Sequence, residues 1–127
     1  MTMFTRLMLV AILAMFAAPA FAGQALQLWH CELDEEVLEE DAIAGLKKWH
    51  AAAKQVKGGE SLEMQVLFPI AVNSDGDFDM WIILTAESIE AWGRFWDNYH
   101  DSDAGDMEDE NEDMFICPDS GLWEVYE

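Results

Sequence analysis

The tripeptide Trp29-His30-Cys31 sets an aromatic ring, an imidazole and a thiol side by side, and metal sites and nucleophilic sites use such groups. A metal site needs more ligands at short spacing, but the other histidines, His50 and His100, lie far away in the sequence. A cysteine nucleophile needs its base within hydrogen-bonding reach, whereas neighbouring residues of a strand point to opposite faces. We therefore expect no catalytic residue here, and we predict neither a metal ion nor a cofactor.

The first 22 residues have the features of a secretory signal peptide. Arg6 is followed by an apolar stretch over residues 7–18, which is short for a membrane span. Small residues then occupy the positions that a signal peptidase reads, and this predicts cleavage between Ala22 and Gly23. Residues 23–127 would then form a single domain in the periplasm or outside the cell, without a membrane segment. An uncleaved N-terminal anchor is the alternative.

Export changes the interpretation of the cysteines. Cys31 and Cys117 are the two cysteines of the chain, and an oxidising compartment favours their pairing. We predict an intramolecular disulfide that closes most of the domain, with free thiols or a bond between two chains as the alternatives.

The chain is strongly acidic, with 26 acidic against six basic residues and a net charge of −20. This balance argues against nucleic acid and anionic membranes, because both bind clusters of cations. Residues 101–113 are especially acidic and invite a calcium interpretation. Counted from Asp101, Glu112 takes the twelfth position of an EF-hand loop, but Gly105 falls at the fifth instead of the sixth. A solvated acidic loop is the simpler prediction, and weak cation association stays open.

Hydrophobic periodicity predicts a strand, a helix, two strands, a second helix and a last strand. The expected bounds are 25–33, 34–57 with Asp34 as N-cap, 62–72, 78–85, 86–100 and 114–126, with an Asp75-Gly76 turn between the middle strands and a turn at 118–121 that splits the last one.

This order predicts an α+β fold, the ferredoxin-like βαββαβ arrangement, with an antiparallel sheet and both helices on one face. The first and last strands are neighbours in this fold, so that Cys31 and Cys117 can meet. The strands are apolar on both faces, and the face without helices therefore needs a cover. A homodimer with its sheets packed face to face is the simplest cover.

The chain also resembles the dimeric α+β barrel group, which includes antibiotic-biosynthesis-monooxygenase-like and NIPSNAP-like domains. The segments MWIILTAESIEAWGRFW (80–96), LKKWHAAAKQVKGG (46–59) and CPDSGLWEVYE (117–127) carry the likeness, which is strongest to uncharacterised exported bacterial members. The resemblance implies the fold and the dimer. It transfers no active-site residue, because the group has no shared catalytic motif.

In such a barrel a ligand would lie inside the cavity, and His30 shares its face of the first strand with Leu26 and Leu28. His30 and Trp81 are therefore the predicted ligand pocket. The leading hypothesis is an exported dimeric protein that binds a small apolar ligand or has a structural role. A cofactor-independent monooxygenase-like enzyme and an acidic Ca²⁺-associating interaction protein are the alternatives.

Overall fold

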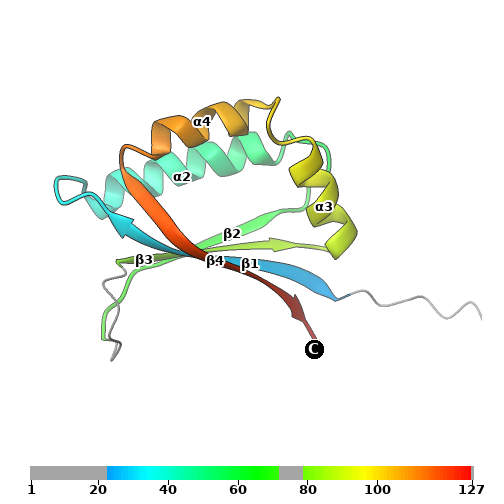
Figure 1. Ribbon diagram of the computed structural model, residues 1–127, viewed down its shortest axis with the longest axis horizontal. Coiled ribbons are helices and arrows are strands. Elements are labelled where there is room, and N and C mark those ends of the chain that lie inside the picture. Colours follow the sequence, from blue (N-terminus) through cyan, green and yellow to red (C-terminus); the bar gives the residue numbers. More distant parts are fainter. Residues whose placement is uncertain (1–22, 72–78, 127) are drawn as a thin grey trace, which may run out of the picture.

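A computed structural model describes residues 23–71 and 79–126 of the chain. Its four strands form one antiparallel sheet in the order β2-β3-β1-β4, and the helices lie on one face of it (Figure 1). The elements are β1 (Gln24–Leu33), α2 (Glu39–Ala53), β2 (Glu63–Leu67), β3 (Met80–Ala86), α3 (Ile89–Asp97), α4 (Asp103–Asn111) and β4 (Phe115–Val125). The predicted ferredoxin-like α+β fold is confirmed, with one helix more than expected. The predicted signal peptide and the Asp75-Gly76 turn lie outside the described residues.

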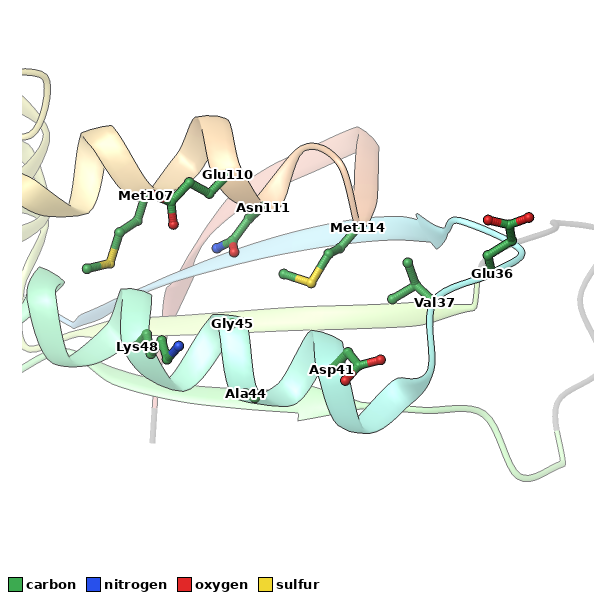
Figure 2. Close-up of a pocket in the computed structure, with 10 residues that line it drawn as sticks. All are labelled: Glu36, Val37, Asp41, Ala44, Gly45, Lys48, Met107, Glu110, Asn111 and Met114. Carbon is green, nitrogen blue, oxygen red and sulfur yellow. The ribbon is translucent and has the colours of Figure 1, made fainter.

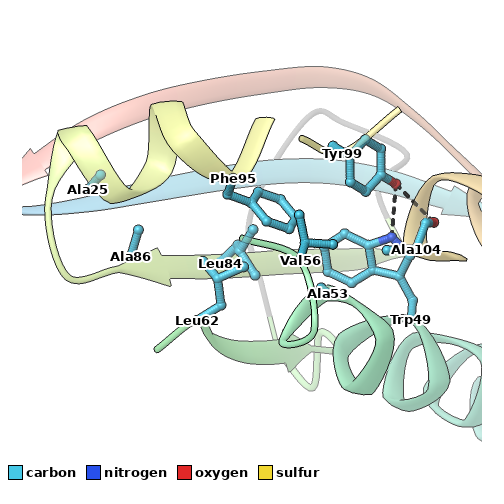
Figure 3. Close-up of a cluster of buried hydrophobic side chains, with 10 residues drawn as sticks. All are labelled: Ala25, Trp49, Ala53, Val56, Leu62, Leu84, Ala86, Phe95, Tyr99 and Ala104. Carbon is cyan, nitrogen blue, oxygen red and sulfur yellow. Dashed lines mark hydrogen bonds between the residues drawn. The ribbon is translucent and has the colours of Figure 1, made fainter. Parts of the chain in front are cut away.

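The strands alternate between a face covered by helices and an uncovered face. Ala25 and Cys31 of β1, with Met80 and Leu84 of β3, are at most 1% exposed and point toward the helices. Their neighbours along the strands point the other way, as alternation requires. The core is thus a layer between sheet and helices, centred on the buried side chain of Phe95 in α3 (Figure 3).

Helix α2 begins later than the sequence predicts. Asp34 is not its N-cap: the side chain of Asp34 accepts a hydrogen bond from the backbone N–H of Glu36 at 3.0 Å and so forms a local turn. The N-cap residue is Leu38, which makes no side-chain capping bond. Asp34 therefore stabilises a turn before the helix, because an Asp side chain can bind nearby backbone N–H groups outside a helix. The first turn of α2 contains the later acids Glu39, Glu40 and Asp41.

The acidic segment 101–113 is not a loop, as predicted, but carries helix α4. Ser102 is the N-cap and accepts a hydrogen bond from the backbone N–H of Gly105 at 3.2 Å. Ala104, Met107 and Asn111 then recur at helical spacing on the side that packs toward α2. These apolar and amide side chains outweigh the repulsion between the acids, which face solvent. Helices α2 and α4 run side by side above the sheet (Figure 1).

Strand β4 is continuous, whereas a turn at 118–121 was expected to split it. The pairing with β1 shifts instead: His30 lies opposite Asp119, but Glu32 lies opposite Ile116. This is a β-bulge at an edge strand, where Pro118 is tolerated because edge positions do not need every backbone N–H. The bulge bends β4, so that its first part rises from the sheet toward α4 (Figure 1).

Candidate functional site

A cavity of about 580 Å³ lies between the covered face of the sheet and the helices. Its floor comes from β1 and β3, its roof from α2, α3 and α4, and its open side from the raised first part of β4. The first part of β4 bounds this space, because Phe115, Ile116 and Cys117 line it. We call this space the helix–sheet cavity.

Five aromatic rings contribute to the wall of the helix–sheet cavity. They come from four elements or their flanks, and they are Trp29, Trp49, Trp96, Tyr99 and Phe115. Trp96 lies edge-on to Trp29 at 6.3 Å between ring centroids, and to Tyr99 at 4.7 Å. Such edge-to-face packing holds the rings in fixed orientations, since each ring edge meets the face of its neighbour. The cavity therefore has a rigid, carbon-rich lining.

Two polar groups of the wall are already satisfied. The indole N–H of Trp49 donates to the hydroxyl oxygen of Tyr99 at 2.9 Å, and that hydroxyl donates to the carbonyl of Ala104 at 3.3 Å (Figure 3). Burial raises the pKa of Tyr99 far above its ordinary value of 10.0, the bond from Trp49 opposes this rise, and Glu108 adds to it. The phenol is thus a neutral structural hydrogen-bonding group at physiological pH.

The indole N–H of Trp96 is different. Its Nε1 is buried, and within the described residues it has no hydrogen-bond partner. A buried donor without a partner costs about 1–3 kcal/mol. The same burial keeps this nitrogen away from the open space of the cavity, so the exposed part of the Trp96 ring, and not its N–H, lines the wall.

Carboxylates gather at the α4 side of the helix–sheet cavity. Glu108, Glu112 and Asp113 line it, together with Asn111, which is 9% exposed. They lie at the C-terminal end of α4, where the helix dipole is negative and the last turn holds no basic residue. No Lys or Arg lines this cavity among the residues that the structure describes. The carboxylates, the helix dipole and the absence of lining Lys or Arg among the described residues together make the mouth of the cavity negative.

A second cavity of about 520 Å³ separates α2 from α4 (Figure 2). Met107 and Asn111 reach into it from α4, and Met114 reaches in beyond the helix end. Gly45 faces them from α2, where a Cβ would collide with the side chains of Met114 and Asn111. The rest of the lining is largely exposed and charged. Fewer of its lining side chains are held in place by packing than in the helix–sheet cavity. We therefore take the helix–sheet cavity as the candidate site.

The structure brings the predicted pair His30 and Trp81 together, but not at this cavity. They lie directly opposite each other on β1 and β3, with ring centroids 3.4 Å apart and planes at 84°. Both are on the uncovered face, and neither lines either of the two cavities. A ligand pocket at His30 and Trp81 thus stays a prediction, and it would require a cover over that face.

The predicted disulfide between Cys31 and Cys117 is present in the structure. It joins β1 to the first part of β4, and Cys117 also lines the helix–sheet cavity. His50 donates from Nε2 to the carbonyl of Leu62 at 2.8 Å, which is a structural role. Over residues 23–71 and 79–126, no three His, Cys, Asp or Glu side chains converge as metal ligands.

The predicted helix over residues 86–100 contains Trp96 and Tyr99, but the sequence analysis did not predict the cavity that they line. The signal available in the sequence was the density of aromatic residues, which make up 12% of the chain. The carboxylates of α4 were missed as a set because residues 101–113 were interpreted as a loop. Helical spacing of Ala104, Met107 and Asn111 after Ser102 could have identified the helix.

No family model matches the chain, and a search of curated proteins finds no match either. Solved structures do match. SnoaB, a cofactor-independent oxygenase from Streptomyces nogalater, is similar at a TM-score of 0.58 and 10% identity over 84% of this chain and 96% of SnoaB. A dimeric ferredoxin-like protein of unknown function from Thermobifida fusca is similar at a TM-score of 0.54 and 12% identity, over 82% of this chain and 92% of that protein.

At such identities the likeness establishes the fold. The chain has the ferredoxin-like α+β fold of these proteins, in agreement with the predicted resemblance to the dimeric α+β barrel group. Among the described residues, none of the helices has the length and apolar character that a membrane span requires.

Proposed function

We propose that this protein is an exported, dimeric α+β barrel protein that binds a small, mainly apolar aromatic ligand in the helix–sheet cavity. The observation that carries the proposal is the aromatic wall, in which Trp96 packs edge-on against Trp29 and Tyr99. Ligand sites are typically apolar cavities with a few convergent polar groups, and 580 Å³ is within the size range of such sites.

The dimer is supported by the uncovered face of the sheet. Leu28 lies opposite Ile83 at its centre, while Trp81 and Trp123 beside them are 37% and 60% exposed. Large exposed apolar patches on soluble proteins usually mark an interface. The neighbour from Thermobifida fusca is described as dimeric, which supports the same assembly here.

Export is supported by the disulfide, because such bonds persist in oxidising compartments and are rare in the cytosol. The proposal retains residues 1–22 as the signal peptide and cleavage between Ala22 and Gly23. Expression of the full chain in a bacterium, fractionation and mass measurement test both parts. A periplasmic product that starts at Gly23 supports them, and a full-length product in the cytosol contradicts them.

The ligand site can be tested with two neighbouring residues of β3 that point to opposite faces. Ile82 lines the helix–sheet cavity, whereas Ile83 is on the uncovered face. Ile82→Phe should fill part of the cavity and weaken binding of quinoline, a neutral aromatic probe, by about ten-fold or more. Ile83→Phe is the matched control and should leave probe affinity within about two-fold.

Tryptophan fluorescence reports the binding, because three indoles line the cavity. Native mass spectrometry of the purified protein shows in addition whether a ligand is retained from the cell. Equal loss of quinoline affinity in both variants, or a wild-type protein that neither binds quinoline nor retains a ligand, would contradict the proposed site.

The dimer has its own test. Ile83→Glu places a charge at the centre of the uncovered face and should convert the dimer to a monomer in sedimentation experiments. Ile70→Glu is the control, since Ile70 is fully exposed away from the strands. A wild-type protein that sediments as a monomer at high concentration would refute the dimer.

The oxygenase alternative is less well supported. It requires His30 and a second titratable side chain within reach of each other inside the cavity, but His30 lies on the opposite face of the sheet and the Tyr99 phenol is held neutral. Calcium association likewise stays a prediction, since the acids of α4 are spread along a helix instead of around a loop. Calorimetry with CaCl₂ tests it directly.

A further inference from the structure

The helix–sheet cavity combines aromatic walls with a negative mouth, and the two features call for the same kind of ligand. Aromatic faces attract cations through their quadrupole, at about 0.5–2 kcal/mol for each favourable contact. Carboxylates at the mouth attract cations through their charge. We propose, on the basis of the proposed function, that the ligand is an organic cation with a flat aromatic ring, such as a quaternary aromatic ammonium compound.

The position of the carboxylates supports this class. Glu108 and Glu112 are one helical turn apart and repel each other, and Asp113 follows immediately. The negative end of the helix dipole lies at the same place, and no basic residue occupies the last turn of α4. A bound cation would relieve this repulsion, whereas an anion would increase it.

A metal ion fits this arrangement less well than an organic cation. Metal sites need three or more ligand side chains around one point, and none of the described Asp, Glu, His and Cys residues form such a group. The aromatic rings opposite the carboxylates are poor ligands for a metal ion, but they can stack against an organic ring.

Three probes of nearly equal shape separate charge from shape: N-methylquinolinium, neutral quinoline and the quinoline-6-carboxylate anion. At mildly alkaline pH and fixed salt, N-methylquinolinium should bind about ten-fold more tightly than quinoline, and the carboxylate should bind more weakly than quinoline. Raising the salt concentration should reduce the preference for the cation and leave quinoline affinity nearly unchanged.

A triple variant locates the source of the preference. Glu108→Gln, Glu112→Gln and Asp113→Asn together should reduce the preference for N-methylquinolinium to about two-fold or less while quinoline still binds, which also shows that the variant is folded. The control removes the same charge from acids of α4 that do not line this cavity, by Asp103→Asn, Asp106→Asn and Glu110→Gln. It should keep the preference.

The outcomes separate the two proposals. If quinoline and N-methylquinolinium bind with equal affinity, or if both triple variants lose the preference equally, the cation inference is wrong while the ligand site stands. If none of the three probes binds, the ligand site itself is contradicted and the inference fails with it.

Discussion

The covered and uncovered faces of the sheet carry similar apolar side chains, but the chain itself buries only one of them. On β3, Leu84 is 1% exposed under the helices, while Trp81 on the opposite face is 37% exposed. The difference shows that alternation in a strand creates two candidate interfaces, and that the surrounding elements decide which one becomes the core. The covered face holds the disulfide and the helix–sheet cavity, and the uncovered face is left for a partner.

The largest effect expected on the covered face is loss of the disulfide. Cys31→Ala with Cys117→Ala should lower the free energy of unfolding by about 2–5 kcal/mol, because the bond closes a long loop in the unfolded chain. Urea unfolding of the variant and of the wild type with and without reductant measures this. A loss below about 1 kcal/mol would mean that the helices alone hold β4 in place.

A matched pair of truncations compares the faces directly. Leu84→Ala should cost about 2–5 kcal/mol of unfolding free energy at any protein concentration, because it leaves a hole in the core. Ile83→Ala should cost about 1 kcal/mol in dilute solution and more where the dimer forms. Equal costs for both variants in dilute solution would show that the uncovered face is buried within one chain.

The hydrogen bond between Trp49 and Tyr99 supports the cavity wall. Tyr99→Phe leaves the buried indole N–H of Trp49 without this acceptor and should lower the free energy of unfolding by about 1–3 kcal/mol. In the double variant with Trp49→Phe, the combined loss should be smaller than the sum of the two single losses. Strict additivity in urea unfolding would argue against the bond.

The raised pKa of Tyr99 predicts a smaller, pH-dependent effect. The unfolded chain releases the phenolic proton near pH 10.0, whereas the folded protein retains it, so that stability contributed by Tyr99 is complete below that pH and is lost as pH rises further. The loss should be about 1.4 kcal/mol for each pH unit above 10. Urea unfolding at several pH values above 10 should show that the free energy of unfolding falls with pH in the wild type and falls less steeply in Tyr99→Phe. The hydrogen bond to Glu124 also raises the pKa of Tyr126, but this residue is exposed, so Tyr126→Phe should flatten the slope less than Tyr99→Phe.

Much of the fold followed from the sequence because its signals are local. Alternation identified which residues of β1 and β3 share a face. Helix α3 was predicted from residue 86 and begins at Ile89, where its N-cap Ser88 accepts a hydrogen bond from the backbone N–H of Ala91 at 3.0 Å. The prediction of a loop over residues 101–113 was wrong because the signal there is not local. Its charge suggested solvation, but α4 is stabilised by packing against α2, a contact between segments far apart in the sequence.

The sequence by itself determined the order of the strands with α2 and α3, the two faces of each strand and the pairing of Cys31 with Cys117, but not the presence of α4. Each of these depends on the period of a short segment or on the presence of only two cysteines. Only the tertiary structure decided where a cavity opens and which side chains line it. A cavity is the volume that side chains from several elements leave unfilled, and here it depends on the bend of β4 and on the position of α4. For this reason Trp96 and the carboxylates of α4 became a candidate site, while His30 was placed on the other face of the sheet.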